Sequence, residues 1–83
     1  MESNELRFPK LLKQKQKELG LNNRDFAKHI GKDRAWLYYV YCGDINKAHK
    51  LAEQTIVHLN ELLGMPLDVM LEHNVVVIKS RCL

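Results

Sequence analysis

The sequence predicts a mostly α-helical domain of five helices, followed by a C-terminal β-strand. Two observations predict this fold class. Apolar residues recur at spacings of three and four along most of the chain, and a glycine stands where each of several such patterns ends. Near the C-terminus, Val75-Val76-Val77-Ile78 departs from that period with four consecutive β-branched residues. A chain of 83 residues makes one small domain with a core of only marginal size.

The N-terminal residues 1–7 are polar, and we expect them to be mobile. The first helix is predicted to start near Phe8-Pro9, because proline is well tolerated at the first helical position. It should end at Leu19, before Gly20. We therefore place a folded domain over residues 8–72 and a separate strand or tail over 73–83.

Two short helices joined by a tight turn are predicted next. Asn22 is placed to cap the first, over residues 23–30, and Gly31 ends it because glycine adopts the left-handed conformation without steric cost. Asp33 is a favourable N-cap for the second, over residues 34–42. The inward face of this second helix carries Leu37, Val40 and Tyr41, and its outward face carries Arg34, Ala35, Tyr38 and Tyr39. A face of one guanidinium, one methyl group and two phenols suits the reading of a surface, for which the DNA major groove is our hypothesis.

A fourth helix is predicted over residues 48–63, with Asn46 as its cap and Gly64 at its end. A short fifth helix is predicted over residues 66–71, with proline in its first turn, and His73-Asn74 interrupts the pattern.

The β-branched run Val75, Val76, Val77 and Ile78 favours a strand. No other segment has a comparable strand pattern, so the backbone of this strand lacks a partner within the chain. We therefore expect it to pair with the same strand of a second copy, as a dimerisation element, or with another protein. The alternative is an apolar tail that packs on the fifth helix.

The charge of the chain is unevenly distributed. Residues 1–50 carry 11 Lys/Arg and 6 Asp/Glu, a balance of +5, whereas residues 51–83 carry 2 and 4, a balance of −2, which together give the net +3. A basic half indicates a side that faces a polyanion, and a solvated, lysine-rich first helix is the alternative. No apolar run is long enough for a membrane span, and the N-terminal residues lack the apolar core of a secretory signal. With two cysteines outside any metal or disulfide pattern, we expect a cytoplasmic protein.

Residues 19–43 resemble the helix-turn-helix of the Cro/C1-type (XRE-like) transcriptional regulators. The family opens with a Gly-Leu-polar-Gln pattern, followed by a Leu-Ala pair, a Leu-Gly turn and a small polar cap. The corresponding residues here are Gly20-Leu21-Asn22-Asn23, Phe26-Ala27, Ile30-Gly31, Asp33 and Leu37, closing with Val40 and Gly43. Leu63-Gly64-Met65-Pro66-Leu67-Asp68 resembles the junction between the family's fourth and fifth helices. The resemblance covers roughly residues 8–72.

This resemblance implies a five-helix, lambda-repressor-like domain. It also implies a phage or mobile-element regulator, most often a repressor, that binds a palindromic operator as a homodimer with half-sites about 34 Å apart. Such a regulator would associate with the bacterial nucleoid when bound to DNA. The chain departs from the family pattern at Trp36, where a small polar residue is common in the family and a large one stands here. It also departs at Gln16 and Tyr41, where many members pair an arginine with a glutamate, so no such ion pair is expected.

The candidate DNA contacts follow from this arrangement. For base edges they are Arg34, Ala35, Tyr38 and Tyr39, and for phosphates Asn22, Asn23, Lys32, Trp36, Lys47 and Lys50. Asn23 is assigned its phosphate through the resemblance. Several of these contacts have an alternative that involves no DNA. Tyr38 would instead pack in the core, and Trp36 would be half-buried between helices. Each lysine would simply be solvated.

The residue inventory argues against an enzyme. The histidines His29, His49, His58 and His73 are scattered without a metal-ligand spacing, and no glycine-rich phosphate loop is present, so we expect no metal and no cofactor. The leading interpretation is a DNA-binding regulator whose partner is double-stranded DNA. The second is an antitoxin or antirepressor, which binds a toxin or a repressor and in which DNA binding is secondary or lost.

Overall fold

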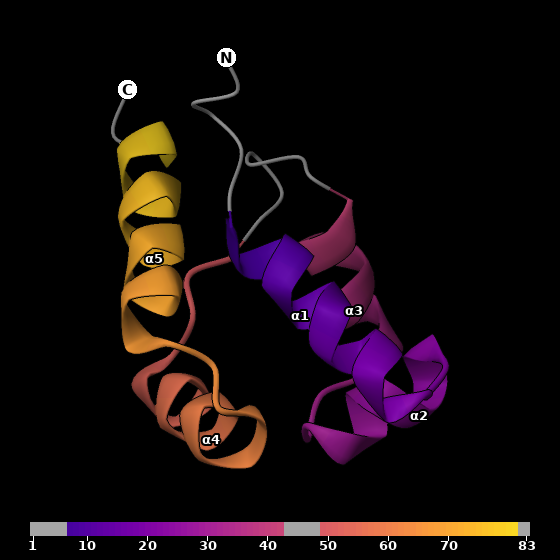
Figure 1. Ribbon diagram of the computed structural model, residues 1–83. Helices are drawn as coiled ribbons and strands as arrows, with labels where there is room; N and C mark the ends of the chain where they lie inside the picture. The colour runs from indigo at the N-terminus through magenta and orange to yellow at the C-terminus, as the bar shows by residue number, and fades with distance from the viewer. Residues whose placement is uncertain (1–6, 43–48, 82–83) are drawn as a thin grey trace.

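The computed structural model describes residues 7–42 and 49–81, which form five α-helices and contain no strand (Figure 1). The helices are α1 (Arg7–Leu19), α2 (Asn23–His29), α3 (Arg34–Tyr41), α4 (Glu53–Leu63) and α5 (Leu67–Arg81). α1 packs against both α3 and α5, α2 packs against α3, and α4 packs against α5. The all-α part of the predicted fold class is confirmed. None of the helices in the described ranges is long and apolar enough to cross a membrane.

Local sequence signals set the ends of the short helices as predicted. The side chain of Asn22 accepts the backbone N–H of Asp25 at 2.8 Å, and that of Asp33 accepts the N–H of Trp36 at 2.8 Å. Each bond satisfies one of the free amides at a helix start. Gly31 has φ +77° in the turn between α2 and α3, a conformation that a residue with a Cβ adopts only at a cost in free energy.

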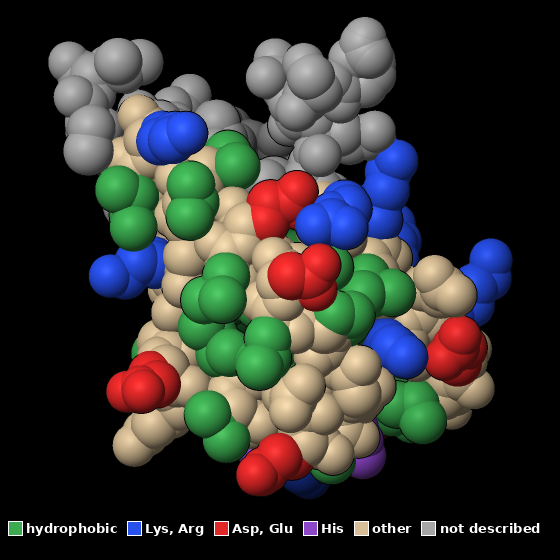
Figure 2. All heavy atoms as spheres, turned by 60° about the vertical axis from the view of Figure 1, so that its left-hand side comes forward, with side chains coloured by type: hydrophobic (Ala, Val, Ile, Leu, Met, Phe, Trp, Pro, Cys, Tyr) green, Lys and Arg blue, Asp and Glu red, His purple; other side chains and the backbone are tan. Residues whose placement is uncertain are grey.

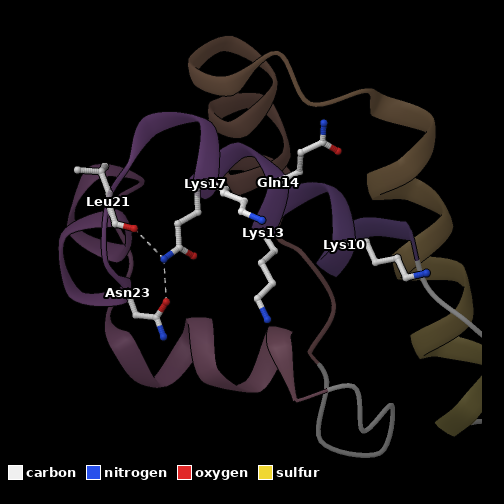
Figure 3. Close-up of a pocket in the computed structure, with 7 residues that line it drawn as sticks. Lys10, Lys13, Gln14, Lys17, Leu21 and Asn23 are labelled. Atoms are coloured by element: carbon white, nitrogen blue, oxygen red, sulfur yellow. Dashed lines mark hydrogen bonds between the residues drawn. The ribbon is translucent and has the colours of Figure 1, made fainter.

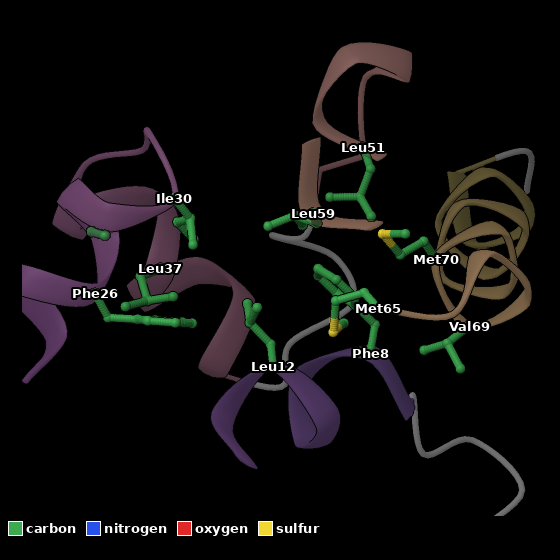
Figure 4. Packing of buried hydrophobic residues seen from close by; sticks show 11 residues of the cluster. Phe8, Leu12, Phe26, Ile30, Leu37, Leu51, Leu59, Met65, Val69 and Met70 are labelled. Carbon is green, nitrogen blue, oxygen red and sulfur yellow. The ribbon is translucent and has the colours of Figure 1, made fainter. Parts of the chain in front are cut away.

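The core is continuous and lies between the helices (Figure 4). On one side, Phe26 and Leu37 bring α2 and α3 together, and on the other, Met65 and Met70 face the junction of α4 with α5. The fully or almost fully buried apolar side chains are Phe8, Leu12, Phe26, Ala27, Ile30, Leu37, Leu51, Leu59, Met65, Val69, Met70 and Val77. Each large side chain buried in this way stabilises the fold by about 1.5–3 kcal/mol before chain entropy is counted.

The predicted C-terminal strand is wrong. Val75, Val76, Val77 and Ile78 all lie within α5, which also runs without a break through His73-Asn74, where the pattern was expected to stop. The intrinsic preference of β-branched residues for strands amounts to about 1 kcal/mol at most, and it depends on context. Here Val69, His73 and Val77 recur every fourth residue and are buried, so helical packing outweighs it.

The fourth helix begins later than predicted. α4 starts at Glu53 rather than at residue 48, and the proposed cap Asn46 lies outside the described residues. The segment before α4 is held by Asn74 of α5, whose side chain accepts the backbone N–H of Leu51 at 2.6 Å and donates to its carbonyl at 3.1 Å. The side-chain amide of Asn74 thus satisfies both the N–H and the carbonyl of Leu51. Because these two backbone groups are bonded to a side chain, they are not available for the hydrogen bonds of a helix. Gly64, at φ +70°, ends α4 as predicted.

Candidate nucleic-acid interface

The outward face of α3 presents the four side chains that the sequence predicts for it. Arg34, Ala35, Tyr38 and Tyr39 are all exposed, whereas Leu37 is fully buried and Val40 and Tyr41 are partly buried against the core. Tyr38 is 64% exposed, which excludes its alternative role as a core residue. The rings of Tyr38 and Tyr39 meet edge to face at 5.5 Å, and Tyr39 meets His49 in the same way at 6.3 Å. These contacts orient the phenols on the surface of α3.

Trp36 is half-buried and packs against the core. The ammonium group of Lys32, in the turn, lies 5.4 Å from the centroid of the indole ring, within range of a cation–π interaction. Trp36 therefore has the half-buried packing that was its alternative to a phosphate contact. The contact with the indole ring also brings Lys32 close to the start of α3. Lys32 is itself only partly exposed, because its stem lies along the protein surface.

Gln16 of α1 joins three helices through one side chain. Its amide nitrogen donates to the carbonyl of Leu21 at 3.0 Å and to the Oδ1 atom of Asn23 at 2.8 Å. Its amide oxygen accepts the hydroxyl of Tyr41, at the end of α3, at 2.7 Å. Gln16 and Tyr41 occupy the two positions at which many members of the resembled family form an ion pair. Here they are joined by a hydrogen bond between neutral side chains.

Tyr41 remains a hydrogen-bond donor at any physiological pH. Burial raises the pKa of its hydroxyl to about 12, because a phenolate loses more by leaving water than a phenol does. The ammonium of Lys13 lies 5.5 Å from the centroid of the Tyr41 ring. The contact of α1 with α3 is thus fixed by the Gln16 hydrogen bond on one side and by a cation over the ring on the other.

An open groove runs along α1 beside these contacts (Figure 3). Among the residues that the structure describes, its lining contains three lysines and no carboxylate: Lys10, Lys13, Gln14, Gln16, Lys17, Leu21 and Asn23. The lysines project from one side of α1 because they are spaced by three and four residues. Such a lining attracts a polyanion.

A second hollow adjoins this groove and shares Gln16 and Asn23 with it. It is also lined by Asn22, Arg24 and Arg34. The carboxylate of Asp25 lies 3.7 Å from the Nε atom of Arg24, so the charge of this arginine is partly offset. Since Gln16 engages the Oδ1 atom of Asn23, the amide nitrogen of Asn23 is turned outward as a donor. The hollow therefore joins the phosphate candidates Asn22 and Asn23 to the base candidate Arg34.

The remaining phosphate candidates are less tightly grouped. Lys50 is exposed after the connector that leads to α4, and Lys47 lies outside the described residues. Among the residues that the structure describes, no three His, Cys, Asp or Glu side chains are close enough together to hold a metal ion.

Sequence reasoning missed four contributors to this surface. Lys10, Lys13 and Lys17 belong to the basic half of the chain but are not among the predicted contacts, and neither is Arg24. The spacing of the three lysines on one face of α1 was the available signal. The position of Arg24 beside Arg34 depends on how α2 packs against α3, which no local pattern contains.

Comparison of the chain with protein-family models, with curated proteins and with solved structures finds no match in any of the three. Function is therefore inferred from the residues and their arrangement.

Proposed function

We propose that this chain is a sequence-specific regulator of transcription, most simply a repressor, that binds double-stranded DNA with α3 in the major groove. The observation that carries the proposal is the exposed face of α3, Arg34, Ala35, Tyr38 and Tyr39, bordered by a groove and a hollow that lysines and arginines line. The five-helix arrangement is then that of a lambda-repressor-like domain, with α2 and α3 as its helix-turn-helix. A homodimer would engage the two halves of a palindromic site.

The parts of this surface have different roles in the proposal. Arg34, at the start of α3, reaches the base edges first, and its guanidinium can donate two parallel hydrogen bonds to O6 and N7 of guanine. The methyl group of Ala35 favours contact with a thymine methyl group, and the hydroxyls of Tyr38 and Tyr39 bond acceptors on bases or phosphates. Asn22, Asn23 and Arg24 would hold the phosphate backbone and so set the depth at which α3 enters the groove.

Selection of bound sites from a random DNA library tests the proposal directly. We expect enrichment of a palindromic sequence, and an electrophoretic shift that weakens steeply as salt is raised, since each phosphate contact adds roughly 0.9 to the salt slope. The absence of any shift at low salt, on both random and genomic DNA, would contradict DNA binding.

The Arg34→Ala variant tests base reading. We expect it to lower the affinity for the selected site by about 1–3 kcal/mol and to leave the affinity for random DNA nearly unchanged. Arg24→Ala is the matched control, because it removes a guanidinium from the same hollow that we assign to a phosphate. It should weaken binding to all sequences alike and reduce the salt slope by about one counterion. An equal loss on both kinds of DNA for Arg34→Ala would place Arg34 on the backbone instead.

A second candidate function is an antitoxin-type or antirepressor-type module that binds a toxin or a repressor. The exposed apolar side chains of α4 and α5, such as Val57 and Leu71, favour it. The two candidates differ in the first experiment: the module requires no DNA shift, whereas the regulator does.

A further inference from the structure

His73 of α5 lies where three other parts of the fold meet. Its side chain is buried, and the ring of Phe8, from α1, lies 5.0 Å from its own ring. Its Nε2 atom donates to the carbonyl of His49 at 3.2 Å, since a carbonyl oxygen only accepts. The small cavity beside the ring is lined by three residues of α3, among them Tyr39. A change in this one ring therefore reaches α1, α3 and the segment before α4.

His49 connects His73 to the exposed face of α3. The ring of His49 meets the ring of Tyr39 edge to face at 6.3 Å, and Tyr39 in turn meets Tyr38 at 5.5 Å. His49 thus contacts α5 through its backbone and α3 through its side chain. We call these two contacts of His49, with His73 and with Tyr39, the His73 latch.

The latch is the weaker end of a short segment that α5 holds. Leu51 is 4% exposed and forms two hydrogen bonds with the side chain of Asn74, so it is anchored in the core. His49 is exposed, and the contacts that hold it are one hydrogen bond and one ring contact. The latch can therefore open while Leu51 stays in place.

A second proton on His73 has no acceptor while the latch is closed. Among the described residues its Nδ1 atom is buried with no partner, so a charged ring would leave an N–H unpaired there. The cavity of about 10 Å³ has room for one water at most, which cannot replace the hydration of an imidazolium. Burial accordingly lowers the pKa of His73.

In the part of the chain that the structure describes, no carboxylate is among the groups that face the His73 ring. The titratable groups that face it are His49 and Tyr39. Glu72, the next residue of α5, is held by Arg7 at 2.7 Å. Figure 2 shows acidic side chains at the surface of the face to which α5 belongs. The exposed titratable side chains of α4, of α5 and of the segment before α4 include Lys50, Glu53, His58, Glu61, Asp68 and Lys79.

We propose that the His73 latch is a pH-sensitive switch for α3: protonation of His73 opens its contact with His49, and the release of His49 frees Tyr39. Opening lets water reach the charged ring, whereas the closed latch excludes it. Tyr39 then loses the ring contact that orients its phenol on the surface of α3. Because Tyr39 is a proposed base contact, DNA binding weakens in acid. This consequence rests on the proposed function, whereas the latch itself does not.

The coupling between the latch and DNA is reciprocal. If DNA binds the closed latch better, then bound DNA must oppose the protonation of His73 to the same extent. A pKa that is lower by about one in the DNA-bound state corresponds to about a tenfold loss of affinity in acid. We expect a loss of about threefold to tenfold between pH 7.5 and pH 5.

An NMR titration of the full chain without DNA, from pH 7.5 to pH 5, tests the latch. The cross-peaks between the rings of His49 and Tyr39 should weaken at the pH at which the ring signals of His73 titrate. The cross-peaks of Phe26, in the core between α2 and α3, should persist and so verify that the domain remains folded. Titration of His73 without loss of the ring contact would overturn the proposal.

His73→Gln is the matched control for the other histidines. It keeps a donor for the carbonyl of His49 but cannot titrate, whereas His49 itself still can. The ring cross-peaks should therefore persist to pH 5 in this variant. Their loss in both proteins, or at the pH at which His49 titrates in the wild type, would overturn the proposal. Circular dichroism verifies the fold of the variant, and if it is unfolded the wild-type titration decides alone.

The affinity for the selected DNA site, measured for both proteins at pH 7.5 and pH 5, tests the consequence for α3. The wild type should lose about threefold to tenfold more affinity than His73→Gln. Equal losses would overturn the switch. The absence of any DNA shift at pH 7.5 would contradict only the proposed function, because the NMR titration needs no DNA. A chain that binds DNA but keeps its latch closed in acid would contradict only this inference.

Discussion

At the scale of single residues, the candidate interface depends on Gln16 more than on any residue that would touch DNA. Its amide holds Asn23 at the start of α2 and Tyr41 at the end of α3. A neutral amide can donate and accept at once, so one side chain fixes two helices to α1 without burying a charge. An arginine and a glutamate at these positions would join the same helices through an ion pair, which carries a desolvation penalty.

Removal of the Tyr41 hydroxyl tests the contribution of Gln16. Tyr41→Phe should lower the free energy of unfolding by about 1 kcal/mol, because the amide oxygen of Gln16 loses its partner in a partly buried place. Urea denaturation measures this change. Tyr38→Phe is the control, since its side chain is largely exposed, and it should change stability by less than about 0.5 kcal/mol. A Tyr41→Phe variant as stable as the wild type would show that the hydrogen bond contributes nothing net.

At the scale of helices, α2 and α3 were predictable because their signals are local. Asn22, Gly31 and Asp33 act within one turn of the residues they organise, so their effect is visible in the sequence. The exposure of Arg34 and Tyr39 follows from the helical period once the start of α3 is known. By contrast, the contact between Gln16 and Tyr41 spans 25 positions and depends on tertiary packing.

The C-terminal helix was missed for the same reason. The run of residues 75–78 is a local signal for a strand, and it is outweighed by partners distant in sequence. Phe8 of α1 meets the His73 ring at 5.0 Å, and Leu51 forms two hydrogen bonds with Asn74. The two residues expected to end the helix are therefore among those that attach it to the rest of the domain.

The N-cap of α3 can be tested as a unit of helix stability. Asp33→Ala removes the acceptor for the N–H of Trp36 and should lower the free energy of unfolding by about 1 kcal/mol. Asp33→Asn retains a side-chain oxygen at the same place and should keep most of the stability. Thermal denaturation of the three proteins measures the difference. Equal losses in both variants would assign the effect to the charge of Asp33 rather than to its hydrogen bond.

At the scale of the whole molecule, the chain separates its chemistry by face. Lysines and arginines line the groove and the hollow along α1, α2 and α3, and one of them, Arg24, lies 3.7 Å from the carboxylate of Asp25. The exposed apolar side chains Leu67, Leu71, Val75 and Ile78 lie on α5, which packs against α1 and α4. The basic surface and the exposed apolar side chains of α5 thus lie on separate helices.

One buried group links the stability of the whole fold to pH. His73 is 1% exposed, and its Nε2 atom bonds the carbonyl of His49 at 3.2 Å. Its Nδ1 atom is buried with no partner, so a second proton would have no acceptor. Burial lowers the pKa of His73 below its ordinary value of 6.5, and the hydrogen bond to the His49 carbonyl opposes this effect only partly. A small cavity lies beside the ring of His73. It is also lined by His49 and by three residues of α3, Trp36, Tyr39 and Val40, so His73 lies close to α3.

Because the unfolded chain binds this proton more readily than the folded one, stability should fall as the pH falls. The contribution of neutral His73 is fully present above pH 6.5, the ordinary pKa, and is lost as the pH falls through the lower pKa of the folded state. We therefore expect the melting temperature of the wild type to decrease between pH 7.5 and pH 5, a range in which most carboxylates remain ionised. His73→Gln keeps a donor for the His49 carbonyl but cannot titrate, so its decrease should be smaller. His58→Gln changes an exposed histidine of α4 and should follow the wild type. If His73→Gln loses as much on acidification as the wild type, the pH dependence arises elsewhere in the molecule.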